Sequence, residues 1–215
     1  MSDRPRLVEL EVAGPPARWA AAGFAVGGDG RLRVGTTDLV LRGGEGGITG
    51  WTLDGAIPAD DGIDGLATTV GHPGPDRPAP QHPNGVVAID HVVIATPDTA
   101  RTFEALEAAG LELRGVRDAG TAQRPLRQGF LLLAEALVEV VGPPEPEDAD
   151  ADARSGPARF WGVTFVTDDL DRAGQVMGDR LGPPRDAVQP GRRIATVPAD
   201  AGLGVRVALM TPRAA

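Results

Sequence analysis

Three stretches of this chain share one layout, a strand followed by a helix and then by a β-rich tail, and this repeat constrains the fold more than any other feature. The clearest copy begins with the apolar strand AIDHVVIA at 88–95. Thr96 and Pro97 follow, and these residue types are typical of the N-cap and the first position of a helix. The repeat therefore predicts an α+β fold built from tandem βαβββ modules.

The same copy continues with an amphipathic helix and three return strands. Phe103 and Leu106 share the expected inner face of the helix, and Gly110 stands where a left-handed residue would end it. The return strands are predicted as LELRGV, RQGFLLL at 127–133 and EALVEVV at 135–141. Glycine and proline follow the last of them and indicate where the module stops.

The third stretch repeats this pattern. Its first strand is FWGVTFV at 160–166, and Thr167 with two aspartates is expected to open the helix. Gly182 is expected to close that helix, and the return strands are predicted at 191–197 and 203–210. The residues expected on the inner face of the helix are Leu170, Ala173, Val176 and Met177.

The register of the copies can be compared at two marked positions. His91 lies in the first strand of one copy where Gly162 lies in the other, and Glu139 lies in the last strand where Ala208 does. His91 to Glu139 spans 48 residues and Gly162 to Ala208 spans 46, so the copies match closely. In the first, shortened copy, Glu9 occupies the position of His91.

The repeats divide the chain into five predicted stretches. A shortened N-terminal module and two complete modules are joined by a Pro/Gly-rich connector and an acidic linker, and the two complete modules are expected to pair. In order, these stretches are 1–55 (shortened module), 56–85 (connector), 86–143 (module), 144–157 (linker) and 158–215 (module).

Composition excludes several classes of function. A net charge of −9 and a pI near 4.8 argue against nucleic acid and anionic membranes as partners. No apolar stretch is long enough to span a bilayer, and no signal peptide is recognisable, so we expect a cytoplasmic protein. The chain has no cysteine, lysine or tyrosine, which excludes thiolate, Schiff-base and Walker A chemistry. His72 and His82 stand in Pro/Gly turns and are interpreted as turn residues, which leaves His91 as the candidate functional imidazole.

The segment HPNGVVAIDHVVIATPDTARTFEALEAAGLEL, together with LVEVVGP at its end, resembles the vicinal oxygen chelate superfamily of glyoxalase-like proteins. The resemblance covers 85–143 well and 158–212 less closely. It implies an open, cupped mixed sheet with a divalent metal held by side chains of the first and last strands. His91 and Glu139 match the ligand types of that family, whereas Gly162 and Ala208 have no side chain that binds a metal.

The resemblance leaves the metal open, because a catalytic divalent ion usually takes three or more protein ligands. Glu9 is a candidate third ligand, and the set would then suit Mn, Fe, Ni or Zn. The alternatives are that His91 and Glu139 simply pair with each other, or that both contact a ligand in a metal-free cup. An enzyme of this family would be a metal-assisted lyase, isomerase or dioxygenase. The alternative function is a metal-free protein that binds or sequesters a small molecule.

Other residues are candidates for contacting that molecule. Gln128 and the pair Arg192 and Arg193 lie at related places in two return strands, where alternation turns one of neighbouring residues inward. An inward arginine favours a ligand with a carboxylate or phosphate. Trp161 is a further candidate. We also expect a homodimer, because an odd number of modules leaves one without a partner, and the modules could serve mainly as a dimerisation scaffold.

Overall fold

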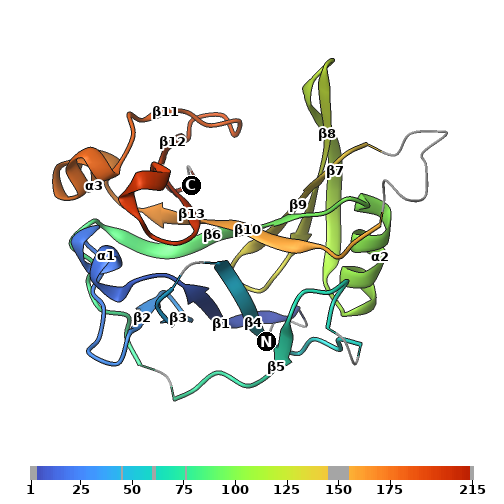
Figure 1. Cartoon of the computed structure of the whole chain (residues 1–215), viewed down its shortest axis with the longest axis horizontal. Helices are drawn as coiled ribbons and strands as arrows, with labels where there is room; N and C mark the ends of the chain where they lie inside the picture. The colour runs from blue at the N-terminus through green and yellow to red at the C-terminus, as the bar shows by residue number, and fades with distance from the viewer. Residues whose placement is uncertain (1–3, 45, 60–61, 76, 145–154, 214–215) are drawn as a thin grey trace. The chain divides into compact units, whose positions relative to one another are not determined.

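The computed structural model describes residues 4–44, 46–59, 62–75, 77–144 and 155–213 (Figure 1). The chain forms two compact units, each assembled from separate stretches. Unit 1 contains Met1–Val8, Gly50–Pro73 and His91–Trp161, and unit 2 contains Glu9–Thr49, Gly74–Asp90 and Gly162–Ala215. The five stretches expected from the sequence divide the chain differently, and their boundaries stay a prediction. Most of the predicted acidic linker, 145–154, lies outside the described residues.

The central copy of the repeat has the βαβββ order expected from the sequence. Its first strand β6 pairs in parallel with its last strand β9, and β9, β8 and β7 then form an antiparallel meander. The elements are β6 (Val86–Ala95), α2 (Thr99–Ala108), β7 (Glu112–Thr121), β8 (Arg124–Leu132) and β9 (Leu137–Gly142).

The C-terminal copy has the same topology. Strand β10 pairs in parallel with β13, and β13, β12 and β11 are antiparallel neighbours. The elements are β10 (Arg159–Thr167), α3 (Leu170–Met177), the 3₁₀ turn η2 (Gly178–Arg180), β11 (Arg185–Asp186), β12 (Arg193–Thr196), the 3₁₀ turn η3 (Ala199–Ala201) and β13 (Arg206–Met210). The predicted α+β class with tandem βαβββ modules is therefore confirmed.

The N-terminal copy is shorter. Strand β1 pairs in parallel with β3, and β3 is antiparallel to β2, so this copy has the crossover but one return strand fewer. Strand β4 follows and pairs in parallel with β5, a three-residue strand inside the predicted connector. The elements are β1 (Arg6–Ala13), α1 (Pro16–Ala21), β2 (Arg31–Val34), β3 (Thr37–Leu41), β4 (Gly47–Asp54) and β5 (Thr68–Val70).

The parallel pair of first and last strands has the same register in the two complete copies. In each, the residue two positions after the marked one in the first strand lies opposite the marked one in the last strand, and the opposed pairs are Val93–Glu139 and Thr164–Ala208. His91 and Gly162 are therefore equivalent in backbone position. In the shortened copy, Glu11, two positions after Glu9, lies opposite Val40.

The start of α2 differs from the prediction by two residues. Asp98, not Thr96, is the N-cap, and its side chain accepts a hydrogen bond from Arg101 N at 3.0 Å. Thr96 instead accepts from Asp98 N at 3.1 Å in a tight side-chain turn between strand and helix. Pro97 lies in that turn and not at the first helical position. The predicted inner residues Phe103 and Leu106 are buried, as expected.

Helix α3 begins later and ends earlier than predicted. Asp169 is its N-cap, in place of Thr167, and accepts hydrogen bonds from two backbone N–H groups. The helix ends at Gly178, whose φ of 57° is the left-handed conformation that favours glycine, so Gly182 is not its end. Val176, expected on the inner face, is 39% exposed. Leu170, Ala173 and Met177 share one face at i, i+3 and i+7, and Val176 at i+6 falls beside that face.

One face of the β6–β9–β8–β7 sheet forms the core of its module. Helix α2 packs on β7, β8 and β9, and its Phe103 lies against Gly129, where an added Cβ would come within 2.2 Å of the ring. Leu131, Val138 and Val140, which alternate with the residues of the other face, are almost completely buried. Helix α2 therefore covers one face of this sheet, and the side chains that alternate with the buried ones lie on the other face.

No helix in the described part of the chain is long and apolar enough to cross a membrane.

His82 is a buried structural residue of unit 2 and not simply part of a turn. It is 3% exposed, its Nδ1 accepts from Ala25 N at 2.9 Å, and its Nε2 lies 3.0 Å from the Arg33 carbonyl oxygen. These partners require the neutral tautomer with the proton on Nε2. Burial lowers the pKa of His82 below the ordinary value of 6.5, and the Arg33 carbonyl opposes this shift more weakly.

We expect the free energy of unfolding to fall as the pH drops below about 6.5, because the unfolded chain then takes up a proton that the buried His82 resists. His82→Gln should remove this part of the pH dependence. Urea denaturation at about pH 7.5 and about pH 5.5 measures it. His72→Gln, which changes an exposed histidine, is the matched control and should behave as wild type. Equal pH dependence in wild type and His82→Gln would contradict this account.

Candidate functional site

The face of the unit 1 sheet opposite α2 carries the candidate site. Residues that are opposed across paired strands share a face, so the registers of β6–β9, β8–β9 and β7–β8 define its rows. The first row is His91, Leu137 and Leu132, the second is Val93, Glu139 and Phe130, and the third is Val141, Gln128 and Arg117. The predicted residues His91, Glu139 and Gln128 therefore come together on one face.

A continuous chain of polar contacts crosses this face. His91 Nε2 lies 3.3 Å from Glu139 Oε2, and Gln128 Nε2 donates to Glu139 Oε1 at 2.6 Å. Arg117 Nε donates in turn to Gln128 Oε1 at 2.8 Å. Each of the four strands supplies one member. Both oxygens of Glu139 are engaged by donors or a ring nitrogen, so its carboxylate is held in a fixed orientation.

The polar chain is partly removed from water. The side chains of His91 and Glu139 are only 10% and 15% exposed, and this low exposure strengthens the electrostatic contact between them. At the other end, the Arg117 guanidinium lies over the Phe130 ring, 5.2 Å from its centroid. The face therefore joins a shielded His–Glu pair to a half-buried cation.

Arg117 determines which way the Gln128 amide points. A guanidinium has only donors, so the amide must turn its oxygen toward Arg117 and its NH₂ toward Glu139. The NH₂ group satisfies the carboxylate, and the oxygen is already in use. Gln128 therefore supports Glu139 by hydrogen bonding and is not oriented as a metal ligand.

The donor set does not fit a tightly held divalent ion. A separation of 3.3 Å between His91 Nε2 and Glu139 Oε2 would let both atoms face one ion. Among the described residues, however, no group of three or more histidine, cysteine, aspartate or glutamate side chains is arranged to hold a metal. Two donors are fewer than a catalytic site normally uses.

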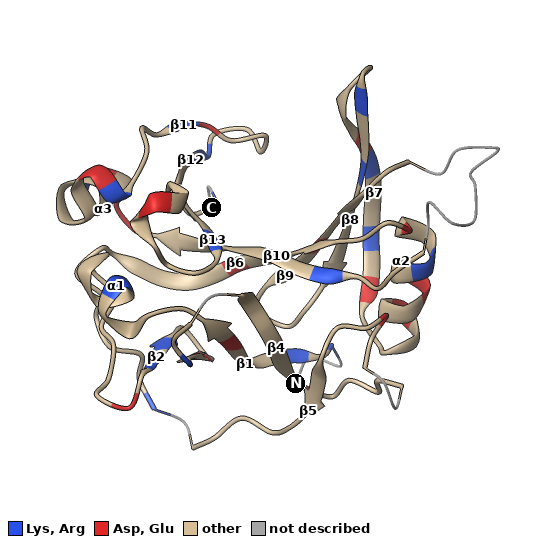
Figure 2. Cartoon of the chain, in the orientation of Figure 1, with Lys and Arg blue, Asp and Glu red and all other residues tan. Residues whose placement is uncertain are grey.

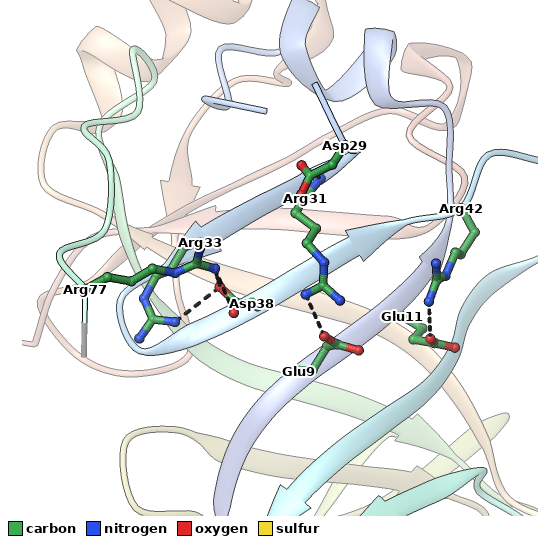
Figure 3. A network of polar contacts seen from close by, with 8 residues as sticks. All are labelled: Glu9, Glu11, Asp29, Arg31, Arg33, Asp38, Arg42 and Arg77. Atoms are coloured by element: carbon green, nitrogen blue, oxygen red, sulfur yellow. Dashed lines mark hydrogen bonds and ion pairs between the residues drawn. The ribbon is translucent and has the colours of Figure 1, made fainter. Parts of the chain in front are cut away.

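Glu9, the predicted third ligand, is engaged in unit 2. Its Oε2 accepts from Arg31 Nη1 at 2.8 Å (Figure 3). It belongs to a row of ion pairs on β1, β2 and β3 that also includes Arg33–Asp38 and Arg42–Glu11. In the shortened copy, Glu9 stands at the position of His91, and its carboxylate forms an ion pair with Arg31.

The equivalent positions of the C-terminal module provide no polar pair. Gly162 and Ala208 have no polar side-chain atoms, and β10 and β13 approach closely at this point. A Cβ added at Gly162 would lie 2.8 Å from the Arg206 carbonyl oxygen. That contact is closer than real Cβ atoms make with backbone, so glycine is required by the spacing of the strands.

Arg192 is buried and the adjacent Arg193 is exposed, as expected from the alternation of side chains along a strand. Arg192 Nη2 pairs with Asp90 Oδ1 at 2.6 Å, both side chains are at least 94% buried, and Nε donates to the Thr211 carbonyl. Its Nη1 is buried without a hydrogen-bond partner among the described residues. Arg193 is about half exposed and lies 3.6 Å from Asp171. Arg192 therefore has a structural partner in unit 2.

Trp161 is 48% exposed, whereas the adjacent Phe160 packs against Trp51 at 5.2 Å between ring centroids.

Two residues of the polar face, Arg117 and Phe130, were not predicted from the sequence. Their contribution depends on the β7–β8 register, which includes a bulge between Leu113 and Gly115 that no sequence motif indicated.

Scans against family models and against curated proteins gave no match. Among solved structures, methylmalonyl-CoA epimerase from Mycobacterium tuberculosis is similar, with 21% identity, a TM-score of 0.45, and coverage of 60% of this chain and 91% of that one. A substituted Streptomyces coelicolor methylmalonyl-CoA epimerase in complex with 2-nitronate-propionyl-CoA has 24% identity, the same TM-score, and coverage of 60% and 99%. A hypothetical protein from Bacillus halodurans has 16% identity, a TM-score of 0.44, and coverage of 59% and 95%.

The chain has a glyoxalase-like fold. Its βαβββ topology is repeated in the central and C-terminal modules, with the same register between the first and last strands.

Removing Asp90 should destabilise the fold strongly, because it leaves the Arg192 charge buried and unpaired. We expect Asp90→Ala to lower the unfolding free energy by about 3–5 kcal/mol. The double variant Asp90→Ala with Arg192→Met should be more stable than Asp90→Ala alone, as measured by urea denaturation. Arg193→Gln is the matched control and should change little. Strictly additive losses in the double variant would contradict a direct pairing.

We expect protein purified without chelator to hold well below one Mn, Fe, Ni or Zn per chain, because two donor side chains hold an ion weakly. Elemental analysis should give the same content for wild type and for the double variant His91→Ala with Glu139→Gln. The two proteins are first compared by circular dichroism to establish equal folding. A near-stoichiometric metal that is lost only in the variant would overturn this conclusion.

Proposed function

We propose that this chain is a member of the vicinal oxygen chelate superfamily that binds a small organic molecule on the polar face of unit 1, without a resident metal ion. Superfamily membership is supported by the sequence pattern around His91 and Glu139 and by the βαβββ topology in which both residues lie. The binding function is supported by the polar face itself.

The observation that carries the proposal is the series of polar contacts through His91, Glu139, Gln128 and Arg117, which joins four strands on the face that α2 does not cover. A sheet face that served only as core would bury apolar side chains, as the opposite face does. Polar side chains that are already ordered lose little conformational entropy when a ligand binds. The series therefore suits recognition of a molecule that offers both hydrogen-bond donors and acceptors.

A metal-free binding or sequestering role agrees best with the chemistry of the donors. The Gln128 amide points its NH₂ group at Glu139, and the Arg117 guanidinium next to it disfavours a second cation nearby. Gly162 and Ala208 leave the corresponding place in the C-terminal module without polar side-chain groups. We infer that His91 and Glu139 contact the bound molecule directly.

A second candidate function is an isomerase that moves a proton at a carbon next to a carbonyl group. One observation favours it, the 3.3 Å approach of the His91 imidazole to the Glu139 carboxylate in a shielded position. Such a pair can accept and return a proton. The lyase and dioxygenase activities that the resemblance implies would require a metal, and the described residues do not supply a full ligand set for one.

Binding can be measured by ¹⁹F NMR with a library of small fluorinated carbonyl and aromatic compounds. We expect compounds that bind wild type with millimolar or better affinity to lose at least about tenfold in affinity in His91→Ala and in Gln128→Ala, because each variant removes a polar contact from the face.

Arg193→Gln is the comparison variant, since it removes a candidate residue of the C-terminal module while leaving the polar face intact. Its affinities should equal those of wild type. If Arg193→Gln lost binding while His91→Ala and Gln128→Ala did not, the site would belong to the other module and the proposal would be wrong.

The predicted homodimer and the cytoplasmic location stay predictions; sedimentation equilibrium would measure the first.

A further inference from the structure

The positive charge of Arg117 has no carboxylate partner among the described residues of the polar face; its contacts there are with a neutral amide and an aromatic ring. Its Nε donates to Gln128 and its guanidinium covers Phe130, but within the described residues its two Nη nitrogens make no hydrogen bond. Glu139, the carboxylate of the face, is held by Gln128 and His91 and not by Arg117. A positioned guanidinium with two available nitrogens is a site for an anion.

We propose that Arg117 binds a carboxylate or phosphate group of the ligand, and so selects anionic over neutral molecules of the same shape. This inference rests on the proposed function, because it concerns one end of the same binding face. The ligand is then an elongated organic acid or phosphate ester whose other polar group reaches His91 and Glu139.

The orientation of Arg117 matters as much as its charge. Gln128 fixes Nε and Phe130 supports the guanidinium plane, so the two Nη nitrogens are presented together. Carboxylate and phosphate oxygens match that planar pair of donors, whereas an amide offers one acceptor. Because both contacts exist before the ligand arrives, little side-chain freedom remains to be lost on binding.

The surroundings of Arg117 add to this preference. Figure 2 shows basic residues along the β7–β8 hairpin, in contrast to the net charge of −9 for the whole chain. Arg114, Arg124 and Arg127 lie on the same hairpin, and Asp118 pairs with Arg127 at 3.4 Å. The hairpin is therefore locally basic, which raises the concentration of anions near Arg117.

The spacing of the strands determines the shape of the ligand. Arg117 lies on β7 and His91 on β6, with β8 and β9 between them. Three interstrand steps of about 4.8 Å separate the two strands by about 14 Å, and Arg117 is level with Ala95, four residues or about 13 Å further along than His91. A molecule that contacts both ends must carry its anionic group and its second polar group at opposite ends.

The inference can be tested by ¹⁹F NMR titration with trans-3-fluoro-4-hydroxycinnamate and its primary amide, which share their shape and a phenol at the far end and differ in charge. Wild type should bind the acid at least about tenfold more tightly than the amide. Arg117→Gln should reduce that ratio to about two or less. Arg117→Lys should keep part of the preference, since it retains charge but not the fork.

Arg114→Gln is the matched control, because it removes the same charge from the same strand at an exposed position. It should leave the acid-to-amide ratio near the wild-type value. An equal loss in Arg114→Gln and Arg117→Gln would overturn the inference in favour of a diffuse electrostatic effect. No binding of the acid up to about 10 mM would overturn it as well.

Failure of this inference is distinguishable from failure of the proposed function. If acid and amide bind equally and both weaken in His91→Ala, the face binds small molecules but Arg117 does not select among them. If binding of both probes is unchanged in His91→Ala and in Gln128→Ala, the face is not the binding site, and both proposals fall together.

Discussion

The parallel pairing of the first strand of each module with its last strand determines where every other part of the module lies. A parallel pair cannot be closed by a hairpin, so a crossover must join its strands, and in the two complete modules this crossover contains a helix and two further strands. The same register in β6–β9 and β10–β13 sets the same two backbone positions side by side in both modules. In one module those positions carry His91 and Glu139, and in the other they carry Gly162 and Ala208.

The two faces of the unit 1 sheet are specialised because the helix can cover only one of them. Phe103 packs against Gly129, and this close contact commits the neighbouring alternate residues to the core. The residues between them must then point the other way. A polar series can exist on that second face without placing unsatisfied groups in the core, because each member has a partner on the next strand.

The repeat, the fold class and the equivalence of His91 with Gly162 were predictable from sequence, because apolar periodicity and turn residues are local signals. The helix starts were less so, since Thr96 and Asp98 are both good caps and tertiary contacts choose between them. Arg117 could not be predicted, because its place beside Gln128 depends on strand pairing and a bulge. The burial of Arg192 likewise depends on Asp90, which is 102 residues away in the chain.

The close approach of β10 and β13 at Gly162 limits what the C-terminal module can carry at this position. A histidine placed there would bring its Cβ within 2.8 Å of the Arg206 carbonyl oxygen, so a substitution at this position alone cannot reproduce the polar pair of the central module. The strands would first have to separate. The difference between the two modules is therefore built into the backbone as well as into the side chains, and exchanging residues between them would not exchange their chemistry.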